Sequence, residues 1–171
     1  AGILVYSVNG DAGVVNHGNI SAIADASYGE YGAFALAAGI YALAYSDAVI
    51  VNDGDISATA IAEANGSARA YGLWAIGGDA ARIENDGDIT VSASSEYGYA
   101  TAVGIKATSD GDAIVENTGS ISVMAVVSYG VYNGHATTAS ATGIDASGYS
   151  VSIYNTGDIN AFASNDLYFG A

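Results

Sequence analysis

A phrase of eight residues recurs five times along the chain, and it restricts the possible folds more than any other feature. It reads aliphatic–x–Asn–x–Gly–x–Ile and then a small polar residue, as in IVNDGDIS at 50–57 and IENDGDIT at 83–90. The other copies are VVNHGNIS at 14–21, VENTGSIS at 115–122 and IYNTGDIN at 153–160. Repeats of this length are typical of solenoids, in which each repeat stacks on its neighbours.

A Gly–Ile or Gly–Leu pair precedes each phrase at a nearly constant distance. From this anchor glycine to the phrase asparagine there are 14, 13, 13, 13 and 12 residues, so the variation in repeat length falls elsewhere. The anchor glycines are Gly2, Gly39, Gly72, Gly104 and Gly143. We therefore expect one solenoid domain over 1–171, with repeats 2–38, 39–71, 72–103, 104–142 and 143–169, or about five coils of 32–39 residues.

Apolar residues alternate with polar ones after the isoleucine of each phrase. The apolar set is Ala22, Ala24, Ala26, Ala58, Ala60, Ala62, Val91, Ala93, Val123, Ala125, Val127, Ala161 and Ala163. A period of two is typical of strands. We predict an all-β fold with three short strands per repeat, stacked in parallel as a β-helix. The alternative, an antiparallel sandwich or barrel, does not require the same residue at the same phase of every repeat.

The asparagine and second glycine of each phrase are predicted to form a structural corner. The residues are Asn16, Asn52, Asn85, Asn117 and Asn155, with Gly18, Gly54, Gly87, Gly119 and Gly157. Asparagine tolerates the left-handed backbone that a sharp corner needs, and its amide can bond to the same amide one coil above. The glycine relaxes the same corner. The phrase isoleucines, Ile20, Ile56, Ile89, Ile121 and Ile159, are expected to fill the interior.

The phrase and its Gly–Ile anchor resemble the repeats of bacterial autotransporter passenger domains and related haemagglutinin-type adhesins, from Gly2 to about Ala163. The resemblance implies a right-handed parallel β-helix, secretion across the outer membrane to an extracellular or cell-surface location, and often an adhesive role. The sequence departs from that family in two ways. It contains no membrane-barrel segment, and its repeats are longer than the most compact passenger coils.

The charge balance excludes some partners. The chain has 18 acidic and three basic residues, a formal net charge of −15. A polyanion gains nothing by neutralising phosphates, so we expect no nucleic-acid binding, and anionic membrane surfaces are disfavoured. No apolar run approaches transmembrane length, so no membrane insertion is predicted. The absence of cysteine excludes disulfides and thiolate metal sites.

Four aspartates, Asp53, Asp55, Asp86 and Asp88, occupy equivalent corner positions in two successive repeats. Stacked carboxylates repel each other, and a bound Ca²⁺ would relieve the repulsion; otherwise they are solvated corners screened by salt. They could also act as a glycosidase pair, with only His17 and His135 to assist. No Ser/His/Asp signature, phosphate-binding loop or dinucleotide fingerprint is found, so we predict no enzymatic activity and no cofactor other than calcium.

Tyrosine is enriched, with 13 copies against three phenylalanines and one tryptophan. Those in the variable half of the repeats are Tyr28, Tyr31, Tyr97, Tyr99, Tyr129 and Tyr132. Tyrosine gives rigid, amphipathic contact area, which suits a surface that binds a glycan or another cell-surface ligand. The alternative is that these side chains cover small cores in their own loops.

Residues 1–3 and 169–171 stand at the same phase of the repeat, and neither end has an evident cap. Open solenoid ends recruit other strands, and a phase-matched solenoid can stack head to tail into an open filament. We therefore predict a non-enzymatic, extracellular stacking unit of a surface filament or fibre. The alternatives are a segment of a long adhesin passenger and, less favoured by the repeats, a carbohydrate-active β-helix enzyme.

Overall fold

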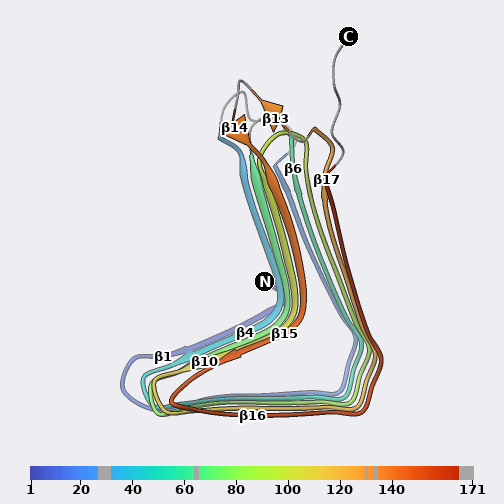
Figure 1. The fold of residues 1–171 in the computed structure, drawn as a ribbon. Coiled ribbons are helices and arrows are strands. Elements are labelled where there is room, and N and C mark those ends of the chain that lie inside the picture. The colour runs from blue at the N-terminus through green and yellow to red at the C-terminus, as the bar shows by residue number, and fades with distance from the viewer. Residues whose placement is uncertain (27–31, 64–65, 130, 133–134, 166–171) are drawn as a thin grey trace.

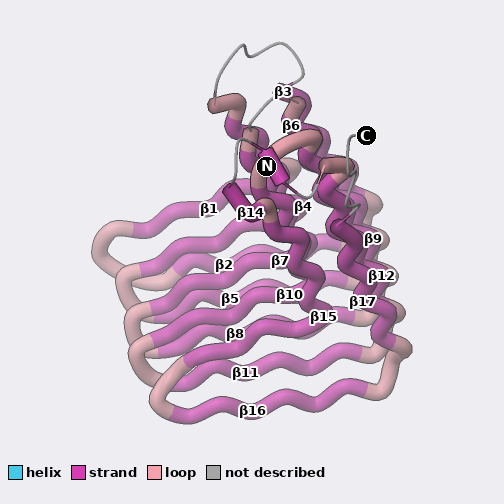
Figure 2. Tube along the Cα trace, turned by 45° about the horizontal axis from the view of Figure 1, so that its top comes forward, coloured by secondary structure: helices cyan, strands magenta, loops and turns pink. Residues whose placement is uncertain are grey.

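The structure, a computed structural model, describes residues 1–26, 32–63, 66–129, 131–132 and 135–165. Over these residues the chain consists of strands and connecting loops without a helix, as Figure 2 shows. It follows that none of the described segments is a helix able to cross a membrane. Each repeat contributes one strand to each of three parallel sheets, which confirms the predicted all-β solenoid.

Each sheet contains five strands. Sheet A consists of β1 (Ile3–Ser7), β4 (Phe34–Ala44), β7 (Ser67–Gly77), β10 (Tyr99–Ser109) and β15 (Thr138–Ser147). Sheet B consists of β2 (Ala12–Asn16), β5 (Asp47–Asn52), β8 (Ala80–Asn85), β11 (Asp112–Asn117) and β16 (Ser150–Asn155). Sheet C consists of β3 (Ile20–Ala26), β6 (Ile56–Ala62), β9 (Ile89–Ser95), β12 (Ile121–Val127) and β17 (Ile159–Asn165). Between β12 and β15, β13 (Val131–Tyr132) pairs antiparallel with β14 (His135–Ala136).

Three consecutive strands of sheets A, B and C form one coil. Coil 1 is β1–β3, coil 2 is β4–β6, coil 3 is β7–β9, coil 4 is β10–β12 and coil 5 is β15–β17. Residues of the same repeat phase pair between coils, so Asn52 lies beside Asn85 and Ile56 beside Ile89. A slip of one residue would turn every interior side chain outward, and the repeated phrase therefore fixes the register.

Sheet A is sharply bent, and the bend gives the coil two arms. Figure 1, which looks along the stack of coils, shows one half of sheet A facing sheet C and the other half facing sheet B. The bend lies at the anchor glycine. In β4, Ala35 and Ala37 are buried before Gly39, whereas Ile40 and Ala42 are buried after it, so the alternation shifts by one residue at the glycine.

The core is thin and is built mostly from alanine and β-branched aliphatic residues. Ile56, Ile89 and Ile121 form one buried stack, with exposed fractions of 2%, 1% and 0%, which confirms the predicted interior column. The predicted interior alanines and valines of coils 2–4 are buried as well. In coil 5 the equivalent Ala161 and Ala163 are exposed, because no described coil covers them.

The anchor glycines allow sheets A and C to meet. A Cβ atom added at Gly72 would lie 2.5 Å from Cγ2 of Ile89 across the core and 2.5 Å from the carbonyl oxygen of Gly104 in the next coil. The same two kinds of neighbour surround Gly39 and Gly104. The anchor glycine and the phrase isoleucine are therefore packing partners, which explains why each repeat carries both.

Candidate assembly interface

The phrase asparagines form a continuous hydrogen-bonded ladder along the solenoid. Nδ2 of each asparagine in coils 1–4 donates to Oδ1 of the asparagine in the next coil at 2.7 Å, the donors being Asn16, Asn52, Asn85 and Asn117. Each Nδ2 also donates to the carbonyl oxygen of the glycine two residues later at 2.5–2.6 Å. The predicted amide contact between coils is confirmed.

The ladder has a direction, and its two ends differ. Every donation runs from one coil to the next coil along the chain. Oδ1 of Asn16 therefore receives no bond from another coil, and its contact with the Gly18 amide is long, at 3.4 Å. Nδ2 of Asn155 has a second hydrogen that meets no acceptor among the described residues, since its one bond goes to Gly157. Coil 1 thus ends in an acceptor and coil 5 in a donor.

The prediction that the corner glycines relax a left-handed backbone is wrong. Among the described glycines only Gly32 has a positive φ, of 71°. The column instead needs glycine because the coils approach closely. A Cβ added at Gly54, Gly87, Gly119 or Gly157 would overlap the carbonyl oxygen of the corner glycine in the preceding coil. Gly18 has no neighbour within 4 Å of that position, since it lies in coil 1.

We expect Asn85→Asp to destabilise the solenoid by about 3 kcal/mol or more, because it removes two donated hydrogen bonds and buries a charge. Asn85 is only 1% exposed. The matched control is Asn155→Asp, which changes the same column in the exposed last coil and should cost much less. Urea unfolding at protein concentrations without assembly measures both. Equal losses of unfolding free energy would contradict the buried ladder.

The four predicted calcium ligands are used in bonds between coils. Oδ2 of Asp53 lies 2.6 Å from Nδ1 of His17, and Oδ1 of Asp86 accepts from the Thr118 hydroxyl at 2.7 Å. Asp55 accepts from the backbone amide of Asp88 at 3.1 Å, and Asp88 accepts from the amide of the following coil. Within the described part of the chain, no three His, Cys, Asp or Glu residues are grouped so as to hold a metal. The calcium hypothesis is therefore not supported.

The predicted tyrosine surface is described only in part. Tyr28 and Tyr31 lie outside the described residues, and Tyr132 lies in β13, where the description does not extend to its side chain. Tyr97 and Tyr129 stack with ring centroids 4.5 Å apart. Tyr99 is 56% exposed on the outer face of sheet A. The stacked pair fits the alternative in which tyrosines cover their own loops, whereas Tyr99 is free for an external contact.

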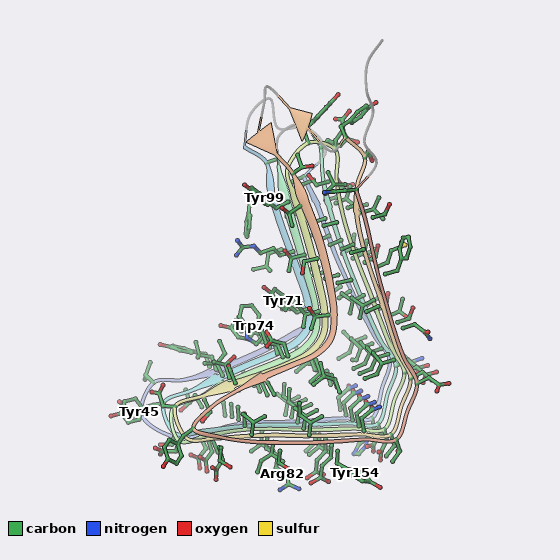
Figure 3. The ribbon with its side chains drawn as sticks, in the orientation of Figure 1. Tyr45, Tyr71, Trp74, Arg82, Tyr99 and Tyr154 are labelled. Atoms are coloured by element: carbon green, nitrogen blue, oxygen red, sulfur yellow. The ribbon has the colours of Figure 1, made fainter. Side chains whose placement is uncertain are left out.

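An aromatic cluster at the bend of sheet A was missed by the sequence analysis. Trp74 stacks on Tyr41 of the preceding coil at 4.6 Å and on Tyr71 at 4.3 Å. Figure 3 shows Tyr71 and Trp74 in the concave angle between the two halves of sheet A, on the face directed away from the coil interior. Burial raises the pKa of Tyr41. The sequence could have indicated this cluster, because an apolar residue precedes the anchor glycine in three repeats. These residues, Ala38, Tyr71 and Val103, are buried together.

Large hydrophobic side chains are exposed mainly at the two ends of the solenoid. Of the sixteen in the described residues, five lie in coil 1 and six in coil 5. They are Leu4, Tyr6, Val8, Val15 and Ile23 in coil 1, and Tyr149, Val151, Ile153, Tyr154, Ile159 and Phe162 in coil 5. In coil 1 they are distributed around the coil, with Leu4 and Tyr6 in β1, Val15 in β2 and Ile23 in β3.

Three of these side chains, Val151, Ile153 and Ile159, belong to interior columns. Ile153 and Ile159 are 50% and 41% exposed, whereas the interior residues beside them in coil 4, Val115 and Ile121, are fully buried. Other exposed hydrophobic side chains lie in outward-facing columns, that is, at equivalent positions of successive coils. These columns carry polar residues in coil 3 and apolar residues in coils 1 and 5. One such column reads Val15, Val51, Glu84, Glu116, Tyr154, and another reads Ile23, Thr59, Ser92, Met124, Phe162. Both ends have an apolar rim, but only coil 5 exposes its interior residues, since Ala12, Val14 and Ala22 of coil 1 are buried.

The fold places the chain among the β-solenoid proteins. No protein-family model matches the sequence, and neither curated proteins nor solved structures give a significant match.

Proposed function

We propose that the chain is a non-enzymatic structural protein of the cell exterior, a β-solenoid unit that joins end to end with other copies into a filament or fibre. The observations that support this proposal are the exposure of interior residues in coil 5 and the apolar rims of coils 1 and 5. Burial of apolar area contributes about 25 cal/mol per Å². The edge strands of three sheets also gain backbone partners when another coil is added.

A second copy is the partner that fits these faces best. Because coils 1 and 5 carry the same repeat, each open column of one copy meets the same column of the next. Ile159 would lie on Ile20, and Ile153 on Val14. The net charge of −15 keeps the sides of such a filament apart and soluble. The alternative occupant is a further coil of the same chain, as in a long adhesin passenger.

The extracellular location rests on the resemblance of the repeats to autotransporter passengers. An adhesive role would use the sides of the filament, where Tyr99 and the outer face of sheet A are open to a glycan or another cell-surface ligand. The competing enzymatic function would need free paired carboxylates. Asp53, Asp55, Asp86 and Asp88 already accept hydrogen bonds between coils, which favours the structural role.

Sedimentation velocity and electron microscopy over a range of concentrations test the assembly. We expect rods whose length grows with concentration, and we expect Phe162→Asp to shorten them because it places a charge in the apolar rim of coil 5. Met124→Asp is the matched control, since Met124 is exposed in the same outward column one coil earlier, with 46% exposure against 60% for Phe162. It should leave assembly unchanged.

A parent chain that stays monomeric at every concentration would overturn the filament and favour the long-passenger arrangement. Turnover of a polysaccharide by the purified chain would overturn the non-enzymatic role.

A further inference from the structure

We propose that the joint between copies continues the asparagine ladder, so that Nδ2 of Asn155 in one copy donates to Oδ1 of Asn16 in the next. This inference rests on the proposed end-to-end assembly and adds its polarity and register. The filament is then head to tail. Coil 1 of each copy stacks on coil 5 of the preceding copy in the same way that coil 5 stacks on coil 4 within one copy.

The direction of the ladder supports this polarity. All four donations between coils run the same way, which leaves an acceptor at Asn16 and a donor at Asn155. Two coil 1 faces would bring together two amide oxygens, and two coil 5 faces would bring together two amide nitrogens. Only the head-to-tail joint pairs a donor with an acceptor, and a buried polar group left unpaired costs free energy.

A second row of hydrogen bonds runs beside the ladder with the opposite donor-to-acceptor direction, and it too is continued only by a head-to-tail joint. In coils 1–3 the side chain three residues after the asparagine accepts from the backbone amide of the next coil. Asn19 accepts from Asp55 N at 3.0 Å, and Asp55 from Asp88 N at 3.1 Å. The equivalent acceptor in coil 5 is the exposed Asp158. In the proposed joint the Asp158 side chain accepts a hydrogen bond from the backbone amide of Asn19 in the next copy.

Apolar side chains enclose both rows at the joint. In the repeat register Tyr154 meets Val15 of the next copy and Phe162 meets Ile23, with exposed fractions between 60% and 72% before assembly. The same two columns carry Glu84 and Ser92 in coil 3. The rim is therefore apolar where copies would meet. In the joint the new amide contact is shielded from water, as Asn85 is shielded by the coils on both sides of it. Hydrogen bonds are stronger in such an environment.

Gly18 is the residue that the isolated chain does not explain. Its four column partners need glycine because the corner carbonyl of the preceding coil leaves no room for a Cβ, yet Gly18 has no neighbour within 4 Å of that position. In the proposed joint the carbonyl of Gly157 of the preceding copy takes that place. The proposed assembly thus gives Gly18 the same close contact that requires glycine in the rest of its column.

The decisive variant is accordingly Gly18→Ala, with Gly13→Ala as its control. Both glycines lie in coil 1 with open space around an added Cβ, but Gly13 projects from the outer face of β2. We expect both variants to unfold at the parental urea midpoint under conditions without assembly. Gly18→Ala should raise the critical concentration for filaments at least tenfold, and Gly13→Ala should not change it. Normal filaments from Gly18→Ala would overturn the register while leaving end-to-end assembly intact.

Cross-linking tests the polarity independently, because the chain has no cysteine. Thr156 and His17 follow the two end asparagines at the corner, so the joint brings them into adjacent coils, with Cα atoms about 4.8 Å apart, within the range that a disulfide spans. A mixture of Thr156→Cys and His17→Cys chains should form mixed dimers on oxidation, and neither variant alone should cross-link. Dimers from His17→Cys alone would overturn the head-to-tail polarity. A parent chain that never assembles would overturn the proposed function itself.

Discussion

Replacing Gly87 by valine is expected to unfold the solenoid between coils 2 and 3 rather than weaken it slightly. An added Cβ would lie 2.6 Å from the carbonyl carbon of Gly54 and 3.0 Å from the carbonyl oxygen of Asp53. These are backbone atoms, and the adjacent amide of Asp86 is bonded to the Asn52 carbonyl at 2.8 Å. Relief of the overlap would therefore break the stacking of the coils. The loss should exceed the ~1–3 kcal/mol typical of overpacking.

The control for this substitution lies in the same column. Gly18→Val should leave the stability of a single copy close to that of the parent, because nothing lies within 4 Å of its Cβ position. Thermal unfolding followed by far-UV circular dichroism at low concentration compares the two variants. A cooperative transition for Gly87→Val at the parental midpoint would refute the close approach of the corners.

Replacing Ile89 by alanine is expected to cost about 2–5 kcal/mol of unfolding free energy, the range for a buried large-to-small change. Ile89 is 1% exposed between Ile56 and Ile121, and it packs across the core against Gly72. Since neither the glycine nor the flanking strands can move in to fill the space, most of the cavity should remain.

The same substitution at the open end of the column provides the comparison. Ile159 is 41% exposed in coil 5, so Ile159→Ala removes fewer contacts and should cost well under half as much. Urea unfolding of both variants at concentrations without assembly gives the difference. A loss at Ile89 no larger than that at Ile159 would be incompatible with a continuous interior stack.

Much of the fold was predictable from the sequence because the repeat fixes which residues stand at the same phase. Alternation with a period of two indicates strands, and equal phase places Asn52 beside Asn85 and Ile56 beside Ile89. Both columns were predicted from one-dimensional spacing, since parallel stacking of identical repeats leaves their register no freedom. The amide ladder followed from the same argument.

The sequence was less informative about the corner. It correctly marked Gly87 and Asp55 as corner residues, but it suggested a left-handed glycine and a calcium ligand. The structure gives the glycine a role in the close approach of two coils, and it makes Asp55 an acceptor for the Asp88 amide. Both roles depend on the exact distance between neighbouring coils, to within a few tenths of an ångström. The spacing of residues along the chain does not specify that distance.

The strands, their register and the columns of equivalent residues therefore follow from the repeat alone. Three features became apparent only in the folded chain: the bend of sheet A, the packing of Gly72 against Ile89, and the stacking of Trp74 on Tyr41 in the concave angle of the bend. This difference arises because a repeat specifies contacts along the stack, between equivalent residues. Contacts across one coil join residues at different phases, and these depend on how three sheets close around side chains of particular size.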